Sequence, residues 1–353
     1  MSINESLFPK ILPVPIGIKR PHWSVIIPTY NRLDYLIDCL ESVLSQALPL
    51  EEMQILVIDD CSSVNIKSIV ERVGKGRIEY YRHDDNLGNA ATFNSGLTLA
   101  KGEWIHILHD DDWVLPNFYA KLQQAIANFS RIKEGVKEIG AVSCRYVTAD
   151  ANKHWLGISP LHRADSGILQ NWLYTVATNN PVSPASVIIK RSVYEHVGGF
   201  YGGFLSSNSE DWDIYKRVAV FYDWWFEPEV LACYRQHSQS ITSQGTKVGL
   251  QTADLRTNIE MSYDYLPIEI RDEITAIARK NYALLALKRA LGYFDIGEVD
   301  AALVQIQEGL KISSEPLVVN VLFQEVLTQS GAEPLRQAIA ELLIDLESFI
   351  DLE

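Results

Sequence analysis

The stretch Trp104–Pro116, WIHILHDDDWVLP, joins an apolar run to three adjacent carboxylates. Trp104–Leu108 reads as a buried strand, and Asp110, Asp111 and Asp112 follow it at once. Capping of a following helix explains one or two acidic residues at such a place. Three beside a buried strand are better explained by a hard divalent cation, which takes oxygen ligands and shares them with phosphates. We therefore expect Mg²⁺ or Mn²⁺ here, together with a substrate diphosphate.

The same pattern, a short apolar run followed by a helical period, occurs three more times before this stretch. The expected strands are Ser24–Pro28, Met53–Ile58, Ile78–Tyr81 and Trp104–Leu108, and the expected helices are Arg32–Gln46, Ile66–Val73, Ala90–Ala100 and Pro116–Ala127. Strands and helices that alternate with short links predict an α/β fold, with a mostly parallel sheet flanked by helices on both faces.

A polar segment follows each of the four strands. In open sheets of this kind, ligands bind outside the carboxyl ends of the strands. We therefore expect one crevice to be lined by Pro28–Arg32, Asp59–Ser62, His83–Gly88 and His109–Asp112.

The pattern of apolar residues changes in the rest of the chain. Residues 140–245 predict short strands near 141–146, 185–189 and 230–234 and a helix over 211–221. From about residue 250, long helical periods predict an all-helical appendage, in which residues 288–316 resemble one tetratricopeptide-like hairpin and fit a plain bundle equally well. We divide the chain into an N-terminal arm (1–21), a domain that carries the candidate site (22–245) and a C-terminal helical domain (250–353).

Composition excludes several classes of protein. The formal charge is −14, and the residues from Gly297 onward contribute −9 of it, with eleven acidic and two basic residues. Nucleic acid is therefore not an expected partner. The four cysteines lack metal or disulfide spacing, no apolar run reaches the length of a membrane span, and no secretory signal is evident. These features predict a cytoplasmic protein.

Two further motifs could carry chemistry. Glu210 and Asp211 begin a predicted helix, where they form either an acidic first turn or a general base aimed into the crevice. His237 follows a predicted strand and could bind metal, pair with phosphate or close a loop. Asp60 could cap the next helix or accept a hydrogen bond from a nucleobase.

Together these motifs resemble the glycosyltransferase family 2 enzymes, which have the GT-A fold. The segments occur in the order and spacing of that family and cover about residues 22–243. They read VIIPTYNR, VIDDCSS, DDNLGNAATFNSGL, GEWIHILHDDDWVLP, GGFYGG, NSEDWDIYKRVA and YRQHSQSIT.

The resemblance implies a donor site at the ends of the first strands. Pro28, Thr29 and Tyr30 would line the nucleobase pocket, and Asp60 would hydrogen-bond the base, usually uracil. The other expected donor contacts are Arg32, Gly88, Asn94 and Asp110.

The resemblance also implies the metal ligands and the base. Asp110 and Asp111 stand at the DxD-type motif, with Asp111 the best match to the metal ligand and His237 near metal and diphosphate. Asp211 matches the catalytic base of inverting members, and Glu210 lies beside it.

The implied activity is that of a metal-dependent, inverting hexosyltransferase. It would move a sugar from a nucleotide-diphosphate donor, expected to be a UDP-sugar, to a hydroxyl of a glycan, lipid or similar glycoconjugate. Two rivals are a nucleotidyltransferase, although no Gly-rich loop follows the first strand, and a non-catalytic nucleotide-sugar-binding scaffold. Peripheral membrane contact and a homo-oligomer through the C-terminal helices stay open.

Overall fold

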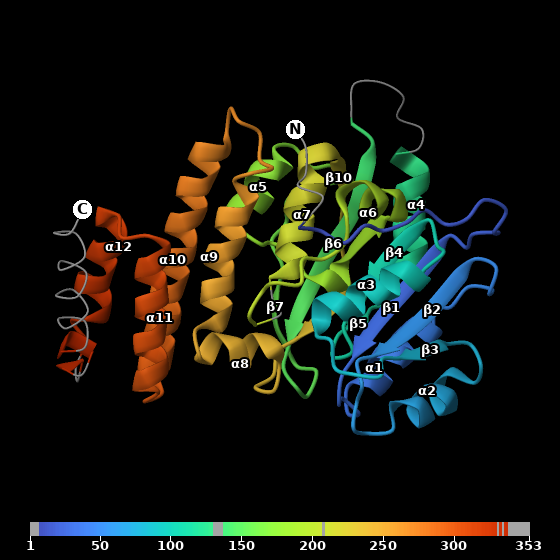
Figure 1. Cartoon of the computed structure of the whole chain (residues 1–353), viewed down its shortest axis with the longest axis horizontal. Helices are drawn as coiled ribbons and strands as arrows, with labels where there is room; N and C mark the ends of the chain where they lie inside the picture. The colour runs from blue at the N-terminus through green and yellow to red at the C-terminus, as the bar shows by residue number, and fades with distance from the viewer. Residues whose placement is uncertain (1–6, 130–136, 207–208, 330–331, 334, 338–353) are drawn as a thin grey trace. The chain divides into compact units, whose positions relative to one another are not determined.

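A computed structural model describes residues 7–129, 137–206, 209–329, 332–333 and 335–337, and all structural statements refer to these residues. The chain forms two compact units, shown with their elements in Figure 1. Unit 1 comprises residues 1–203, 210–237 and 265–267, and unit 2 comprises 204–209, 238–264 and 268–353. The domain boundaries drawn from the sequence stay predictions.

Unit 1 is built on a ten-stranded sheet with the main order β3-β2-β1-β4-β9-β6-β10-β5, to which β7 adds beside β6 and β8 beside β10. The strands are β1 (Trp23–Thr29), β2 (Met53–Asp59), β3 (Glu79–Arg82), β4 (Trp104–Ile107), β5 (Trp113–Val114), β6 (Ile139–Ala149), β7 (Trp155–Ile158), β8 (Gly167–Ile168), β9 (Val187–Lys190) and β10 (Asp223–Arg235).

The sheet is mixed. Strands β1 to β4 are parallel, as the strand–helix alternation predicts. Beyond them, β9 runs antiparallel to both β4 and β6, and β6 and β10 are parallel to each other. The irregular region of the sequence therefore extends the same sheet with strands of both directions.

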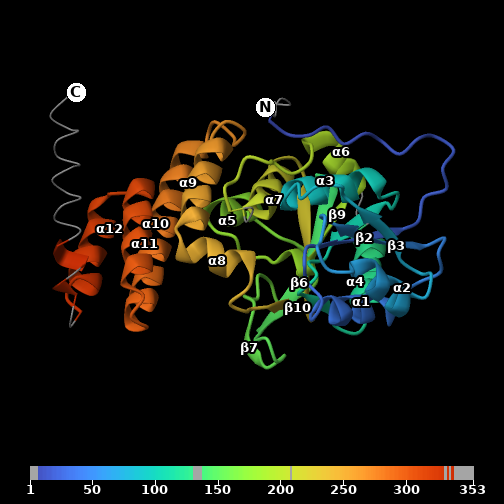
Figure 2. The ribbon, with the colours of Figure 1, turned by 60° about the horizontal axis from the view of Figure 1, so that its bottom comes forward.

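Helices cover both faces of this sheet, because successive side chains of a buried strand point to opposite sides. Val25 and Ile27 of β1 join the core cluster that also contains Leu36 and Leu40 of helix α1. Ile26 points the other way, against Gly96 of helix α3. Figure 2 accordingly shows α1, α2 and α4 on one side of the strands and α3 and α6 on the other.

Five helices of unit 1 correspond to predicted ones, two of them with later starts, whereas α5 and α6 were not predicted. The helices are α1 (Leu36–Leu44), α2 (Ile66–Gly74), α3 (Asn89–Leu99), α4 (Phe118–Phe129), α5 (Trp172–Thr178), α6 (Arg191–Val197) and α7 (Glu210–Phe221), with a 3₁₀ turn η1 (Pro184–Ser186).

Backbone conformation explains the late start of α4. Asn117, the second residue of the predicted helix, has φ of +70°, a left-handed conformation that interrupts a helix. The late start of α1 has no such explanation, because the left-handed Asn31 lies before the predicted helix. The predicted helical starts at Arg32 and Pro116 are corrected to Leu36 and Phe118.

Unit 2 is helical, as predicted. Its helices are α8 (Ile241–Lys247), α9 (Leu250–Ser262), α10 (Arg271–Asp295), α11 (Val299–Ile312) and α12 (Pro316–Val321), followed by a π-helical segment η2 (Leu322–Val326).

Helices α9, α10 and α11 lie side by side in both views of the molecule (Figures 1 and 2). Small residues let α10 and α11 approach closely, since a Cβ on Gly309 would lie 2.9 Å from that of Ala286. Within the described residues, none of the helices combines the length and apolar character needed to cross a bilayer. The choice between a tetratricopeptide-like hairpin and a plain bundle stays open.

Candidate active site

Four strand ends meet at one edge of the sheet of unit 1. The register pairs Thr29, at the end of β1, with Asp59, at the end of β2, and Asp59 with Arg82 of β3. On the other side of β1, Leu108 donates its N–H to the carbonyl of Ile26. The polar segments that follow these strands therefore leave the sheet beside one another.

Asp110 is buried and is contacted by two residues of the segment after β1. Its Oδ2 accepts a hydrogen bond from the Thr29 hydroxyl at 2.6 Å, and Arg32 Nε lies 3.0 Å from its Oδ1. Burial, reinforced by the charge of Asp111, raises the pKa of Asp110 to about 7 in spite of these partners. Three residues expected to contact the donor thus form one connected group.

Asp111 faces His237 and Arg32. Its Oδ2 lies 3.0 Å from His237 Nε2 and 3.8 Å from Arg32 Nη2. Burial opposes ionisation, but the hydrogen bond from His237 and the charge of Arg32 hold the pKa of Asp111 below its ordinary value. An ionised carboxylate beside an imidazole nitrogen is a suitable ligand pair for a divalent cation.

Asp112 and His109 complete a group of possible metal ligands; the sequence left open which of the three aspartates binds the metal and did not indicate His109. One ligand atom from each of His109, Asp111 and Asp112 lies within 4.8 Å of the others. Asp112 is fully buried; its Oδ1 accepts the backbone N–H of Arg235 at 2.8 Å, but its Oδ2 has no hydrogen-bond partner. Burial and the charge of Asp111 raise the pKa of Asp112. This oxygen is open to a ligand in the described structure, and together with His109 and Asp111 it fits Mn²⁺ or Mg²⁺.

Arg235 holds the acidic segment in place, a role that the sequence did not reveal. Its Nε donates to the carbonyl of Asp111 at 2.7 Å, and its Nη2 pairs with Asp38 at 2.9 Å. The guanidinium also lies over the rings of Tyr35 and Trp113, at 4.2 and 4.5 Å from their centroids. The sequence feature that could have indicated this role is the position of Arg235 at the end of a strand, two residues before the predicted metal ligand His237.

Asp211 lies in the first turn of α7, with Glu210 buried beside it. Its Oδ1 accepts the N–H of Trp212 at 2.7 Å, and its Oδ2 lies 3.5 Å from Asn180 Nδ2. Burial raises the pKa of Asp211, and the nearby charge of His109 opposes that rise. A carboxylate with a raised pKa near the ligand cluster is suited to act as a general base. Asn180 was not found from the sequence, because it lies in a loop without a motif.

Asp60 ties the loop after β3 to the end of β2. Its Oδ1 accepts from the ring of His83 and from the N–H of Leu87, and its Oδ2 accepts from the N–H of Gly88, all at 2.8–2.9 Å. Gly88 has φ of +84° and precedes α3. A carboxylate has about four acceptor positions, so Asp60 retains capacity for a ligand.

The turn after β1 exposes the aromatic ring predicted to lie at the nucleobase. Pro28 is buried opposite Ile58 of β2, whereas Tyr30 is 49% exposed. The left-handed Asn31 turns the chain here, and its N–H donates to Ser62 Oγ at 2.8 Å. The side chain of Tyr30 is therefore free to contact a ligand.

Asn94 uses both ends of its amide on the backbone of Phe200. Its Nδ2 donates to the Phe200 carbonyl at 2.9 Å, and its Oδ1 accepts the Phe200 N–H at 2.8 Å. A Cβ on Gly199 would lie only 2.2 Å from that oxygen. Asn94 thus fastens the loop before α7 to α3, and its contact with the donor stays a prediction.

Replacing Asn94 by Ala is expected to lower the free energy of unfolding by about 1–3 kcal/mol, because two backbone groups of Phe200 lose their partner. Urea denaturation followed by fluorescence measures this change. Thr98→Ala, at an exposed position of the same helix, is the matched control and should stay within about 0.5 kcal/mol of wild type. An Asn94→Ala protein as stable as the control would contradict the structural role.

A known protein family matches a segment in the first half of the chain. Residues 24–132 match the family model described as Glycosyl transferase family 2. The putative teichuronic acid biosynthesis glycosyltransferase TuaG of Bacillus subtilis is 37% identical over 95 residues, which are 26% of this chain and 37% of TuaG. The chain spans about a third of the length of most curated relatives that it matches.

Two solved structures share the fold over nearly the whole chain. TarS 1–349 of S. aureus in complex with UDP-GlcNAc has a TM-score of 0.58 at 15% identity and covers 80% of this chain and 90% of its own. The mannosyltransferase PcManGT of Pyrobaculum calidifontis, in complex with GDP-Man and Mn²⁺, has a TM-score of 0.55 at 18% identity and covers 95% and 89%. At these identities the likeness shows the fold alone.

Proposed function

We propose that this chain, which belongs to glycosyltransferase family 2 through residues 24–132, transfers a sugar from a nucleotide-diphosphate donor to a hydroxyl of an acceptor. The observation that carries the proposal is the cluster of Asp110, Asp111 and His237 at the strand ends, with Asp211 within electrostatic reach of His109 beside it.

In this proposal a divalent cation is held by Asp111 and His237, with Asp112 and His109 as further ligands. Bound there, Mn²⁺ or Mg²⁺ would neutralise the charge that develops on the departing nucleoside diphosphate. Arg32, between Asp110 and Asp111, adds a fixed positive charge. Thr29 and Arg32 orient Asp110, which we place beside the ribose or the cation.

Asp211 takes the proton from the acceptor hydroxyl as that oxygen attacks the anomeric carbon from the side opposite the leaving group. A single displacement of this kind inverts the anomeric centre. Asn180 and the N–H of Trp212 hold the carboxylate in position. Glu210, the adjacent carboxylate, is the alternative base.

We assign the nucleobase to the exposed ring of Tyr30 and to Asp60, and infer a uridine nucleotide. The UDP-GlcNAc complex of TarS supports a uridine nucleotide through the shared fold. Because PcManGT, with the same fold, is in complex with GDP-Man, a guanosine donor is tested as the alternative. The acceptor is inferred to be a glycan or lipid-linked glycoconjugate, in line with the name of TuaG.

A nucleotide-sugar screen tests the proposal. Purified full-length chain is incubated with UDP- and GDP-sugars and Mn²⁺, and hydrolysis and transfer are followed through the released nucleotide. Release of a nucleoside diphosphate supports the proposal, whereas pyrophosphate would indicate a nucleotidyltransferase. Binding of UDP without any turnover would favour the scaffold.

The rate of sugar transfer should decline at acidic pH, and the midpoint of this decline should lie above about 3.9, the ordinary pKa of an aspartate side chain. Asp211 works only when deprotonated, and burial raises its pKa, so kcat/KM declines as pH falls through that raised value. A pH profile of kcat/KM, with UDP binding measured over the same range, tests this. The acid limb should be absent from the residual activity of Asp211→Asn; a profile flat down to pH 4 would contradict the assignment.

A further inference from the structure

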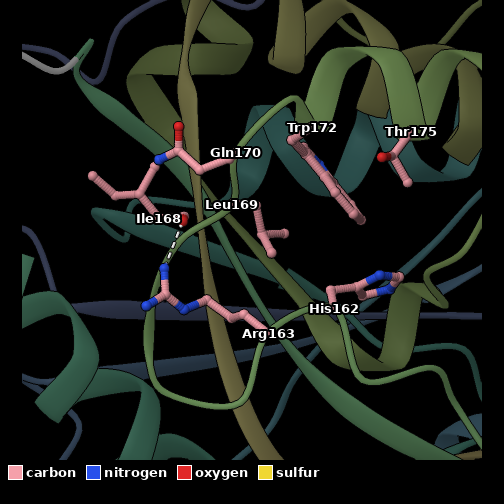
Figure 3. Close-up of a pocket in the computed structure, with 7 residues that line it drawn as sticks. All are labelled: His162, Arg163, Ile168, Leu169, Gln170, Trp172 and Thr175. Atoms are coloured by element: carbon pink, nitrogen blue, oxygen red, sulfur yellow. Dashed lines mark hydrogen bonds between the residues drawn. The ribbon is translucent and has the colours of Figure 1, made fainter.

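A second concave site lies in unit 1 between α5 and the segment that leads to β8. It is a cavity of about 170 Å³, well above the roughly 15 Å³ that one water molecule needs. Figure 3 shows its lining, which consists of His162, Arg163, Ile168, Leu169, Gln170, Trp172 and Thr175. No carboxylate is in this set, although the chain as a whole is strongly acidic.

Trp172 forms one wall of this cavity and carries a buried hydrogen-bond donor. Its ring is 5% exposed and packs against His162 and Trp224, at centroid distances of 5.0 and 5.6 Å. Its Nε1 has no hydrogen-bond partner. The indole nitrogens of Trp23 and Trp225 also lack partners, but those rings belong to the hydrophobic core and do not line this cavity. A buried N–H at a cavity wall is suited to bind a ligand oxygen.

Arg163 supplies a positive charge in a held position. Its Nη1 donates to the Ile168 carbonyl at 2.9 Å, the bond drawn in Figure 3, and its Nε donates to the Asp165 carbonyl at 2.6 Å. The guanidinium lies against Gly167, where an added Cβ would be 2.7 Å from Cζ. Glu227, which accepts a hydrogen bond from Ser166, does not line the cavity.

The cavity is connected to the proposed base. His162 hydrogen-bonds the carbonyl of Pro181, the residue after Asn180. Asn180 in turn lies 3.5 Å from Asp211, and Trp212 Nε1 donates to the carbonyl of Val176 in α5 at 2.6 Å. The cavity wall and the start of α7 are therefore joined by direct contacts, on the α5 side of Asp211 and apart from the ends of β1 to β3.

We propose that this cavity is an acceptor subsite that binds an anionic sugar unit, through its carboxylate or phosphate, next to the unit whose hydroxyl Asp211 deprotonates. Arg163 would bind the anionic group, and Trp172 would donate to a sugar oxygen. The assignment rests on the proposed function, because it takes Asp211 as the base. It goes further in naming the charge of the acceptor and the residues that select it.

The test uses methyl glucuronide as probe, methyl glucoside as its neutral match and inorganic phosphate as a free anion. Binding to full-length chain is followed by the ¹⁵N–¹H resonance of the Trp172 indole, assigned with Trp172→Phe. Methyl glucuronide should shift this resonance at concentrations at least about tenfold lower than methyl glucoside, as expected for a charge-assisted hydrogen bond.

Arg163→Gln should weaken methyl glucuronide binding about tenfold or more, and Gly167→Ala should weaken it by displacing the guanidinium. Arg77→Gln is the matched control, since Arg77 is also half-buried and bonds two backbone carbonyls, those of Leu48 and Met53, away from the cavity lining. Hydrolysis of the donor sugar in the absence of acceptor should be the same in all three variants. No shift, or equal affinity in Arg163→Gln and wild type, would overturn the subsite.

Inorganic phosphate separates the two sources of the anion. Tighter binding of phosphate than of methyl glucuronide would identify a site for a free anion and overturn the acceptor assignment. The proposed function has its own readout: it fails if wild-type chain does not hydrolyse any nucleotide sugar, whatever the probes do at Trp172.

Discussion

Asp211→Asn is expected to reduce sugar transfer by about 10²–10⁴-fold while donor binding stays near wild type. Asparagine has the same shape and can keep the hydrogen bond from the Trp212 N–H, but it cannot accept the proton of the acceptor hydroxyl. The loss should therefore appear in kcat. Single-turnover transfer and calorimetric titration with UDP and Mn²⁺ separate the two effects.

Two other carboxylates sharpen this test. Glu210→Gln changes the adjacent buried carboxylate. If this variant lost most of its transfer activity while Asp211→Asn kept full turnover, Glu210 and not Asp211 would be the general base. Asp150→Asn is the neutral control, because that carboxylate only closes a turn by accepting from Asn152 and His154. Full turnover in both Asp211→Asn and Glu210→Gln would remove general-base catalysis by α7 from the mechanism.

The elements of the first half could be predicted because most of the strands are largely apolar and end in turn residues. Met53–Ile58 lies within β2, and Ile66–Val73 corresponds to α2 within one residue. Where the prediction of the start of α4 failed, a single backbone conformation decided the outcome. The left-handed Asn117 delays α4, and this preference is not visible in a periodicity of side chains.

The second half was less predictable because its pairing is long-range. Strand β10 is thirteen residues long, pairs with β6 some eighty positions earlier and contains register shifts near Val230. A strand with such irregularities has no clean alternation, and only the segment Val230–Tyr234 stood out. The antiparallel insertion of β9 between β4 and β6 likewise follows from no local signal.

The location of the candidate site could be predicted from topology, but the hydrogen bonds between its residues could not. Parallel strands that end together bring Thr29 and Asp110 into contact across eighty-one positions. The clamp of Arg235 on the carbonyl of Asp111 spans 124 positions and has no motif of its own. Asn94 was placed at the donor by resemblance, whereas its hydrogen bonds lead to Phe200.

Chelation by EDTA is expected to stop transfer, and Mn²⁺ or Mg²⁺ is expected to restore it. Asp111 is the critical ligand in this account, because His237 and Arg32 keep it ionised, whereas Asp110 is buried against Thr29 with a raised pKa. Asp111→Asn should therefore lower the rate of transfer about 10²-fold or more, which is a rise of about 2.7 kcal/mol or more in activation free energy. The same variant should bind Mn²⁺ more weakly in the presence of UDP.

Comparison of three variants separates metal binding from general charge. Asp111→Asn should lose both Mn²⁺ affinity and turnover, and His237→Gln should lose Mn²⁺ affinity to a smaller extent, since it removes a neutral ligand. Asp85→Asn removes an exposed charge from the loop between β3 and α3 and should change neither. Electron paramagnetic resonance of Mn²⁺ measures the affinity directly. Undiminished activity in EDTA, or Mn²⁺ binding unchanged in Asp111→Asn, would show that the carboxylates after β4 do not hold a catalytic cation. Protonation of Asp110 and Asp112 would then have to explain how these carboxylates can be buried.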